Sequence, residues 1–332
     1  MDGSRREFVS GLAVSAGAGL LGIRPAVAGA EPPETTRIRL INRPVLCEAP
    51  NYVAEELLLG EGFTDIQYVK RAAGLAEDAP GAGDVDITML FGPPMILRID
   101  TGEPIVFLAG VHTGCVEVFA NEGIRSFLDL KGKRVSIPAF RSASHSLVAT
   151  MVAHVGLNPN RDIVWAIHPG TEGPRLLAEG KVDAFLASPP LAQEARAKKV
   201  GHVILNTVAD RPWSQYFCCM VVGNRDFVRR NPIATKRALR AILKASDLCA
   251  REPEKVARFL VERGYVDRSD YALQSMKEVA YGKWKEFNPH DTVRFYSLRL
   301  YEAGLIKSSP QKILAQGTDW RFLNELKKEL KG

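Results

Sequence analysis

Short apolar runs alternate with amphipathic segments from residue 37 to residue 222. The segment RIRLINR (37–43) alternates apolar and polar positions as a half-buried strand does, and APNYVAEELLL (49–59) has helical spacing and ends at Gly60. Both patterns recur, and we expect strands at 37–43, 66–69, 85–90, 105–111, 115–121, 134–138, 163–167, 182–187, 203–206 and 216–222. Strands that alternate with helices predict an α/β protein with parallel-rich sheets, here in two successive blocks.

The pattern becomes wholly helical after Gly223. The segment 232–251 is long and amphipathic, with Ala238, Ile242 and Ala245 near one face. Further helices are expected at 253–264, 271–281, 292–303 and 319–330. The chain is therefore predicted to end in a helical tail that follows the two α/β blocks.

The composition is that of a globular protein. The 332 residues are 46% hydrophobic and 25% charged, enough apolar material for a large core in one large domain or two. No run reaches the roughly 18 uncharged apolar residues of a membrane-spanning helix. The net charge of +6 is mild and spread out, so it predicts neither a nucleic acid partner nor an anionic membrane.

The first thirty residues carry the features of an export signal in the expected order. Paired arginines at 5–6 precede an uncharged run at 11–23 and small-residue tripeptides at 26–30. Paired arginines in this place resemble the twin-arginine signal. We expect residues 1–30 to be cleaved near Ala28 or Ala30 and the mature protein to be periplasmic; an ordinary N-terminal helix is the alternative.

The cysteines are few and show no metal-binding spacing. There are five, Cys47, Cys115, Cys218, Cys219 and Cys249, so at least one stays unpaired within a monomer. Cys218 and Cys219 are adjacent in a strand-like run and are expected on opposite sides of the sheet. We predict no metal site and expect buried, small apolar side chains. A disulfide among Cys47, Cys115 and one of the adjacent pair is the alternative.

Five segments in a fixed order carry a family resemblance. They are EAPNYVAEELLLGEGF (48–63), DVDITMLFGPP (84–94), IRSFLDLKGKRVSIP (124–138), RSASHSLVATMVAHVGL (141–157) and LLAEGKVDAFLASPPLAQEA (176–195). Together they resemble periplasmic solute-binding proteins of ABC transporters of the nitrate/taurine/sulfonate type, which are related in fold to thiamine-pyrimidine precursor binding proteins. The run LDLKGKRVSIP (128–138) is the most specific of them.

The resemblance implies a two-lobed fold of the periplasmic binding protein type II class, with a ligand cleft between the lobes. Lobe one would comprise 37–113 plus 221–332 and lobe two 114–220, with crossings near Gly114 and Met220. Closure of the lobes over a small-molecule ligand would prepare the protein to dock transiently on an ABC permease. The resemblance implies no cofactor and no nucleic acid partner.

The turn at 139–146 is the leading candidate for ligand contact, because ligands of open α/β sheets lie beyond the carboxyl ends of strands. Ser142, Ser144 and His145 begin a helix whose free N–H groups point outward, and Arg141 adds a full charge. These groups would hold a sulfonate, carboxylate or phosphate. Plain helix capping is the alternative. The family often has Gly where this chain has Phe140-Arg141, which leaves open which N–H groups face the ligand.

The other candidates lie at further strand ends. Arg43 could clamp a planar anion, with a surface salt bridge as the alternative. Trp213 and Tyr216 could stack on the ligand, with core packing as the alternative. The remaining candidates offer close backbone approach or hydrogen bonds and are Gly92, Pro93, His112 and Pro189. His112 and His145 each have a purely structural role as the alternative.

Motifs of catalysis are missing, among them the GxSxG elbow, the HExxH zinc motif and the phosphate-binding loop, so we assign no catalytic residue and expect a non-enzyme. We predict the extracytoplasmic substrate-binding subunit of an ABC importer that binds a small organic anion, sulfonate-like or carboxylate-like. The alternatives are a pyrimidine or thiamine-precursor binding protein, an enzyme on the same fold, and a receptor that presents its ligand to a sensor kinase. Fold by itself does not decide among them.

Overall fold

The structure is a computed structural model that describes residues 31–43, 45–71 and 76–330. The expected export signal at 1–30 lies outside the described residues. The strands, helices and short 3-10 helices (η) are, in chain order, β1 (Arg37–Asn42), η1 (Leu46–Glu48), α2 (Pro50–Val53), α3 (Glu55–Gly60), β2 (Asp65–Lys70), η2 (Ala76–Asp78), α4 (Ala79–Ala82), β3 (Ile87–Phe91), α5 (Gly92–Asp100), β4 (Ile105–Thr113), β5 (Glu117–Ala120), η3 (Phe127–Leu130), β6 (Arg134–Ile137), α6 (Ala143–His154), β7 (Val164–Ile167), η4 (Gly170–Glu172), α7 (Gly173–Ala178), β8 (Ala184–Ala187), α8 (Leu191–Ala197), β9 (His202–Asn206), η5 (Trp213–Gln215), β10 (Phe217–Asn224), α9 (Arg225–Arg230), α10 (Pro232–Arg251), α11 (Pro253–Glu262), α12 (Ser269–Glu278), η6 (Lys283–Lys285), α13 (Pro289–Glu302), α14 (Pro310–Gly317) and α15 (Arg321–Glu329).

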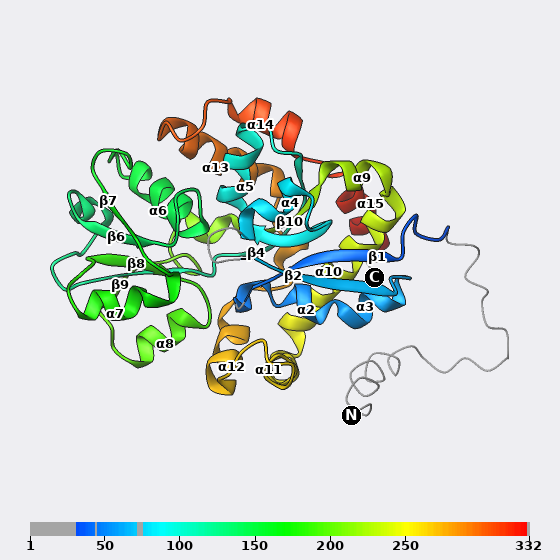
Figure 1. The fold of residues 1–332 in the computed structure, drawn as a ribbon, viewed down its shortest axis with the longest axis horizontal. Helices are drawn as coiled ribbons and strands as arrows, with labels where there is room; N and C mark the ends of the chain where they lie inside the picture. Colours follow the sequence, from blue (N-terminus) through cyan, green and yellow to red (C-terminus); the bar gives the residue numbers. More distant parts are fainter. Residues whose placement is uncertain (1–30, 44, 72–75, 331–332) are drawn as a thin grey trace.

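Two α/β lobes are visible in Figure 1. Lobe one contains the parallel pair β1–β2 and the sheet β3-β10-β4, and hydrogen bonds from Asp86 N–H to Arg39 O (2.9 Å) and from Ile41 N–H to Thr88 Oγ1 (3.2 Å) join the two. Lobe two is a five-stranded sheet in the order β7-β6-β8-β5-β9, with α6 on one side and α7 and α8 on the other (Figure 1). The predicted strands are thus present, but their grouping into sheets is a tertiary result.

The expectation of parallel-rich sheets is wrong. β10 is antiparallel to both β3 and β4, and β5 is antiparallel to both β8 and β9. The parallel pairs are β1–β2, β6–β7 and β6–β8. The antiparallel strands β5 and β10 each follow a passage between the lobes, so they enter their sheets in the opposite sense to the strands of the βα units.

The two passages between the lobes are tied together at Gly114. This residue follows β4 with φ of 44°, and a Cβ there would lie 2.1 Å from the carbonyl oxygen of Thr207, which follows β9. A side chain therefore does not fit, and glycine alone tolerates both the conformation and the approach. The Thr207 hydroxyl accepts hydrogen bonds from the N–H groups of Cys115 (3.0 Å) and Val116 (2.9 Å). Lobe boundaries near Gly114 and Met220 stay a prediction.

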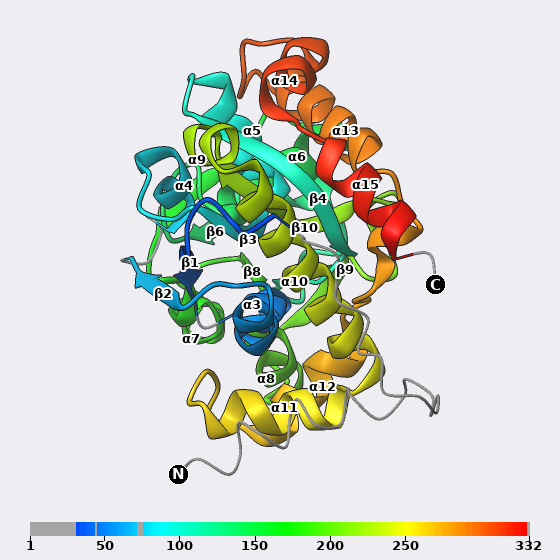
Figure 2. The ribbon, with the colours of Figure 1, turned by 90° about the vertical axis from the view of Figure 1, so that its right-hand side faces the viewer.

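The C-terminal region is helical, as predicted, with α14 as an element that the sequence pattern did not suggest. The long α10 runs next to α3 and α15 (Figure 2) and also packs on α2. Its amphipathic face supplies buried residues such as Ala238, Ile242 and Ala245. α13 packs on both α5 of lobe one and α6 of lobe two. Among the described residues, none of the helices combines the length and the apolar character needed to cross a bilayer.

Candidate functional site

A buried ion cluster lies where the two lobes meet, and Arg43 is its centre. Arg43 follows β1 and has a side chain only 17% exposed; its Nη1 lies 3.2 Å from Glu48 Oε1 and 3.5 Å from Glu77 Oε1. Glu48 and Glu77 are 0% and 3% exposed. The guanidinium also lies over the Phe91 ring, 5.8 Å from its centroid. Arg43 is thus not part of a surface salt bridge, which was the alternative at the sequence level.

Glu77 joins this cluster to the helix that the sequence singled out. Its Oε1 accepts a hydrogen bond from Ala143 N–H, at the first residue of α6, over 3.4 Å. A carboxyl group of lobe one therefore already lies at the positive end of the lobe-two helix. A second contact between the lobes is the hydrogen bond from Leu46 N–H to the carbonyl oxygen of Pro189 (2.9 Å).

Several polar atoms of the cluster have no hydrogen-bond partner among the described residues. They are Arg43 Nη1, both carboxyl oxygens of Glu48, Glu77 Oε2 and His112 Nδ1. The ion-pair distances place opposite charges side by side, but their geometry is not that of hydrogen bonds. Buried polar groups in proteins are normally satisfied, so these atoms make the cluster a candidate for contact with a bound molecule or with water.

Burial shifts the charge balance of the cluster. Removal from water raises the pKa of Glu48 to about 8; nearby Arg43 opposes the rise, and Cys47 and Glu77 add to it. For Arg43, burial alone would lower the pKa, but Glu48 and Glu77 outweigh burial and raise it, so the guanidinium stays charged. At neutral pH the cluster is therefore a fixed cation beside a largely protonated Glu48 and the carboxyl group of Glu77.

Replacement of Glu48 with Gln tests this shift. Because the pKa is raised in the folded protein, Glu48 holds its proton longer when folded than when unfolded. The free energy of unfolding should then fall between about pH 4.5 and about pH 8, by up to about 1.4 kcal/mol per pH unit. Glu48→Gln should remove this loss, so its stability relative to the unmodified protein should rise with pH in denaturant titrations. Exposed Glu122→Gln is the control, and a pH-independent difference for Glu48→Gln would refute the assignment.

His112 and Pro189, both predicted site residues, border this cluster. His112 is fully buried near the end of β4; its Nε2–H donates to the carbonyl oxygen of Cys47 (3.0 Å), and its ring makes an edge contact with Tyr281. Pro189 makes the contact between the lobes described above. Gly92 and Pro93 begin α5 next to Phe91 and are buried, with Gly92 packed toward Met220 on β10.

The predicted residues of the 139–146 turn differ in their burial and in their contacts. Ser142 is the N-cap of α6, accepts a hydrogen bond from His145 N–H (3.3 Å) and is buried, while Ser144 is partly exposed. His145 is buried between Phe140 and Trp165, its Nδ1 accepts from Arg141 N–H (3.2 Å), and burial lowers its pKa to about 4. Helix capping is therefore visible, and contact of these side chains with a ligand stays a prediction.

Arg141 points to lobe one. It has a φ of 65°, and its Nη2 donates to Leu97 O (3.3 Å) and Thr101 Oγ1 (3.0 Å) and pairs with Glu103 (3.4 Å). Its own carbonyl oxygen accepts from Arg98 Nη1 (3.0 Å). Arg141 thus binds the end of α5 and holds the lobes together, a role that the sequence did not indicate.

The cap residue Ser142 is expected to contribute modestly to the free energy of unfolding. Ser142→Ala removes the acceptor for His145 N–H and should lower the free energy of unfolding by about 1 kcal/mol, whereas Ser142→Gly should cost a few tenths of that. Thermal or urea unfolding of the two variants measures the difference. Equal stability of the alanine variant and the unmodified protein would show that the cap contributes nothing.

Trp213 and Tyr216 both pack against helix α13. Trp213 is 3% exposed and packs against Phe295 and Tyr296 of α13, and Tyr216 stacks on Phe295 with ring centroids 3.9 Å apart. Core packing was the alternative to ligand stacking, and these contacts favour it for both residues.

The cysteines gather in a way that no spacing in the sequence indicated. All five are free and buried, and the Sγ atoms of Cys47, Cys115 and Cys219 lie within 4.8 Å of one another. Cys218 Sγ is 3.1 Å from Cys115 Sγ. Cys218 and Cys219 both interact with Cys115, although adjacent strand residues were expected on opposite sides of the sheet. The reason is that the register of β10 against β4 shifts on either side of Cys219.

Two surface pockets lie elsewhere. One lies between α10 and α15, around Lys236, Arg237 and Phe322, and the other beside β1 and α9, around Arg39 and Asn231. Neither contains a predicted site residue. The buried ion cluster is therefore the candidate site on chemical grounds rather than on shape.

A family model decides the relationship of the chain to known proteins. The model of the NMT1-like family matches residues 31–261, which is more than half of the chain. The chain belongs to the NMT1-like family. This NMT1-like protein is also similar to the nitrate/nitrite binding protein NrtA of Nostoc sp. (strain PCC 7120), with 24% identity over 303 residues that cover 82% of this chain and 68% of the relative.

Solved structures confirm the predicted fold. The periplasmic nitrate-binding protein NrtA from Synechocystis PCC 6803 is similar with a TM-score of 0.73 and 17% sequence identity. The matched region covers 91% of this chain and 90% of the NrtA chain. The alkanesulfonate-binding protein SsuA from Xanthomonas axonopodis pv. citri, bound to MOPS, has a TM-score of 0.71 at 15% identity and covers 86% and 99%. The NMT1-like protein therefore has the two-lobed periplasmic-binding-protein fold, and the resemblance to solute-binding proteins is confirmed.

Three residues of the site were missed by the sequence reasoning, namely Cys47, Glu48 and Glu77. Cys47 and Glu48 follow the first strand, where the strand-end rule predicts ligand contacts. Glu48 begins the segment EAPNYV, and Cys47 directly precedes it. Glu77 lies in the Ala/Gly/Pro-rich stretch 72–84, whose composition favours a loop or a short broken helix. No signal in the NMT1-like sequence indicates that this glutamate meets Arg43.

Proposed function

We propose that this protein is the extracytoplasmic solute-binding subunit of an ABC importer and that its solute is a small organic anion that also carries a hydrogen-bond donor. One observation carries the proposal: a buried guanidinium and two buried carboxyl groups have unpartnered polar atoms where the lobes meet. The family and the relatives, which include a nitrate/nitrite binding protein and an alkanesulfonate-binding protein, support the transport role.

Arg43 would bind the acidic group of the solute. A guanidinium presents donors in a fork that matches a carboxylate or sulfonate, and its charge acts strongly because little water reaches it. The Coulomb attraction of a buried pair exceeds that of an exposed one several-fold. The anion contact thus moves from the α6 N-terminus, where Glu77 already lies, to Arg43.

Glu48 and Glu77 would bind a donor on the same solute. An ammonium or amide group can satisfy the acceptors Glu48 Oε2 and Glu77 Oε2, which a nitrate or a simple alkanesulfonate leaves unpaired. Leaving buried acceptors unpaired costs about 1–3 kcal/mol each, so the site should discriminate between solutes with and without a donor.

Lobe closure would complete the site. The contacts of Glu77 with Ala143 and of Leu46 with Pro189 join loops of the two lobes next to Arg43. Their separation would open the ion cluster to solvent, and their formation around a solute would give the shape that docks on a membrane permease. The predicted signal at 1–30 and a periplasmic location fit this role.

A thermal-shift screen of the protein without residues 1–30 tests the proposal. The matched probes are taurine, which has both groups, ethanesulfonate, which has only the acid, and ethylamine, which has only the base; carboxylate analogues, nitrate and aminopyrimidines extend the panel. A solute at 100 times its Kd adds about 2.7 kcal/mol to stability.

We expect stabilisation by compounds that combine acid and donor, and calorimetry should then give a smaller Kd for them than for either half. Stabilisation by a neutral pyrimidine alone would move the protein to the precursor-binding alternative. Conversion of a bound compound to a product would identify an enzyme. Either result overturns the anion proposal.

A further inference from the structure

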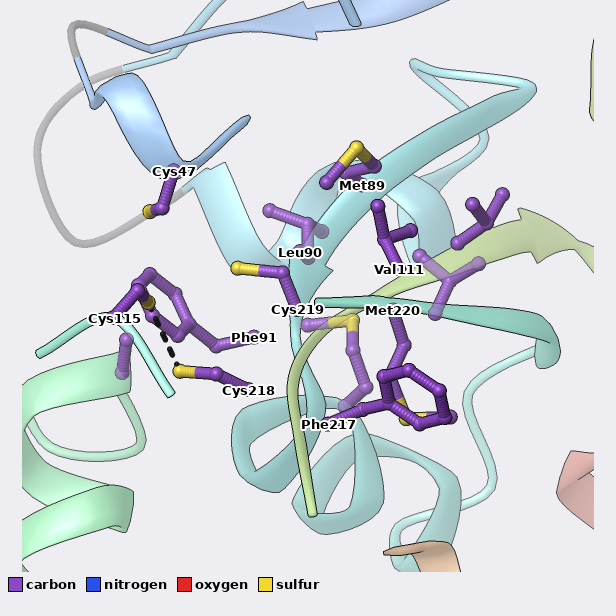
Figure 3. Packing of buried hydrophobic residues seen from close by; sticks show 14 of the residues in the cluster. Cys47, Met89, Leu90, Phe91, Val111, Cys115, Phe217, Cys218, Cys219 and Met220 are labelled. Carbon is purple, nitrogen blue, oxygen red and sulfur yellow. Dashed lines mark hydrogen bonds between the residues drawn. The ribbon is translucent and has the colours of Figure 1, made fainter. Parts of the chain in front are cut away.

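Three thiols from distant parts of the chain converge beside the ion cluster. Cys47 lies in η1, Cys115 follows the first passage between the lobes, and Cys219 lies on β10; their Sγ atoms are within 4.8 Å of one another. Their exposures are 0%, 3% and 0%. In Figure 3 these sulfurs and that of Cys218 lie on the left of the view, and the apolar side chains of Met89, Val111 and Phe217 lie to their right.

The spacing of the sulfurs suits a single metal ion. Sulfur ligands lie about 2.3 Å from zinc, so three sulfurs around one ion are separated by roughly 4 Å. Soft thiolate ligands select Cu(I) and Zn(II) over hard cations, which prefer oxygen. A three-sulfur set is complete for trigonal Cu(I) and leaves one position of tetrahedral Zn(II) for an outside ligand.

The segments that carry the sulfurs are held in place by neighbouring groups. His112 faces Cys219 across the β4–β10 pair and donates from Nε2 to the carbonyl oxygen of Cys47 over 3.0 Å. The Tyr281 hydroxyl donates to the carbonyl oxygen of Leu46 over 2.5 Å, and Cys115 N–H donates to Thr207 Oγ1 over 3.0 Å. Ligands that are already positioned lower the entropic cost of metal binding.

A buried histidine and an arginine lie beside the three thiols. His112 is 0% exposed, and its Nδ1 has no hydrogen-bond partner among the described residues. The His112 side chain interacts with the Cys219 thiol, so a buried polar group supports one of the proposed ligands from the side. Arg43 is close enough to Cys47 and Cys219 for their charges to interact, so its positive charge would stabilise an anionic thiolate complex.

We propose that Cys47, Cys115 and Cys219 bind one thiophilic metal ion, Cu(I) or Zn(II), when their thiols are reduced. The site goes beyond the proposed solute-binding function and does not depend on the nature of the solute. Metal binding replaces the three thiol protons, which are released to solvent, and involves no change in oxidation state. A disulfide between Cys115 and Cys218 would remove one ligand and prevent binding.

Metal uptake by the protein without residues 1–30 tests the proposal. The protein is fully reduced and handled without oxygen, its five thiols are counted after denaturation, and Cu(I) or Zn(II) is added in competition with a chromophoric chelator. We expect one tightly held equivalent of at least one of the two ions. Loss of that ion is expected in Cys47→Ser, Cys115→Ser and Cys219→Ser.

Two variants are matched controls. Cys249→Ser changes a buried free thiol of α10 that is not part of the set and should keep the ion. Cys218→Ser cannot form a disulfide with Cys115 and should keep it too. The proposal is overturned if the fully reduced protein takes up neither ion, if each of the three variants still binds, or if Cys249→Ser loses binding equally.

X-ray absorption of the metal-loaded, unmodified protein gives a second measurement that needs no variant. A shell of sulfur neighbours near 2.3 Å is expected for Zn(II), and a shell of nitrogen and oxygen alone would refute the site. Failure of metal binding leaves the solute proposal intact, because the solute screen is read without added metal.

Discussion

Arg43→Met is expected to abolish solute binding and to lower the free energy of unfolding by about 3–5 kcal/mol. The stability loss follows because the carboxyl group of Glu77, which is 3% exposed, loses the guanidinium that pairs with it, and the ionised fraction of buried Glu48 loses the same partner. The binding loss follows because the buried guanidinium is the proposed partner of the acidic group of the solute. Urea unfolding measures the first effect and calorimetry with the best compound of the screen measures the second.

A triple variant separates the two effects. Arg43→Met combined with Glu48→Gln and Glu77→Gln leaves no buried charge in the cluster, and neutral replacement of a buried ion set often restores or exceeds the original stability. We expect it to recover most of the stability of the unmodified protein but not its solute binding. If the triple variant binds the solute as tightly as the unmodified protein, the ion cluster is structural and the solute lies elsewhere.

Trp213→Ala is expected to cost about 3–5 kcal/mol of stability through the cavity it leaves under α13. The side chain is 3% exposed and touches Phe295, Tyr296 and His154 with its ring, so the neighbours cannot collapse fully into the space. The prediction is a lower denaturation midpoint with the Kd for the solute unchanged, measured well below the transition temperature.

The control for this variant is Tyr301→Ala, which truncates an aromatic residue of α13 that is 48% exposed and should change stability by less than about 0.5 kcal/mol. A Trp213→Ala protein of normal stability with weakened solute binding would restore the sequence-level idea that Trp213 stacks on the ligand. The tertiary contacts of the indole argue for the other result.

Local signals in the chain were sufficient for the elements that depend on near neighbours. RIRLINR became β1 and the segment around Ala149 became α6, with Ser142 as its N-cap, because alternation, helical spacing and capping act over a few residues. The same reasoning failed for the direction of β5 and β10, since strand pairing depends on partners far away in the chain.

The candidate site was predictable only in part. The strand-end rule selected Arg43, the centre of the ion cluster, and His112 and Pro189, which border it. It also selected Arg141, Trp213 and Tyr216, whose contacts are with α5 and α13. Arginine and aromatic side chains are long, and a position beside a strand end does not determine the direction in which they extend. The role of Glu77 could not be predicted from the sequence, because its partners, Arg43 and Ala143, are 34 and 66 residues away along the chain.

The sequence by itself determined the two α/β blocks, the helical tail and the membership of a solute-binding family, since each rests on patterns read along the chain. Only the tertiary structure decided which buried charges meet and which thiols converge. Cys47, Cys115 and Cys219 come together because η1, the first passage between the lobes and the bulged beginning of β10 meet at the same place. Such contacts arise from the packing of whole elements, which no local spacing of residues encodes.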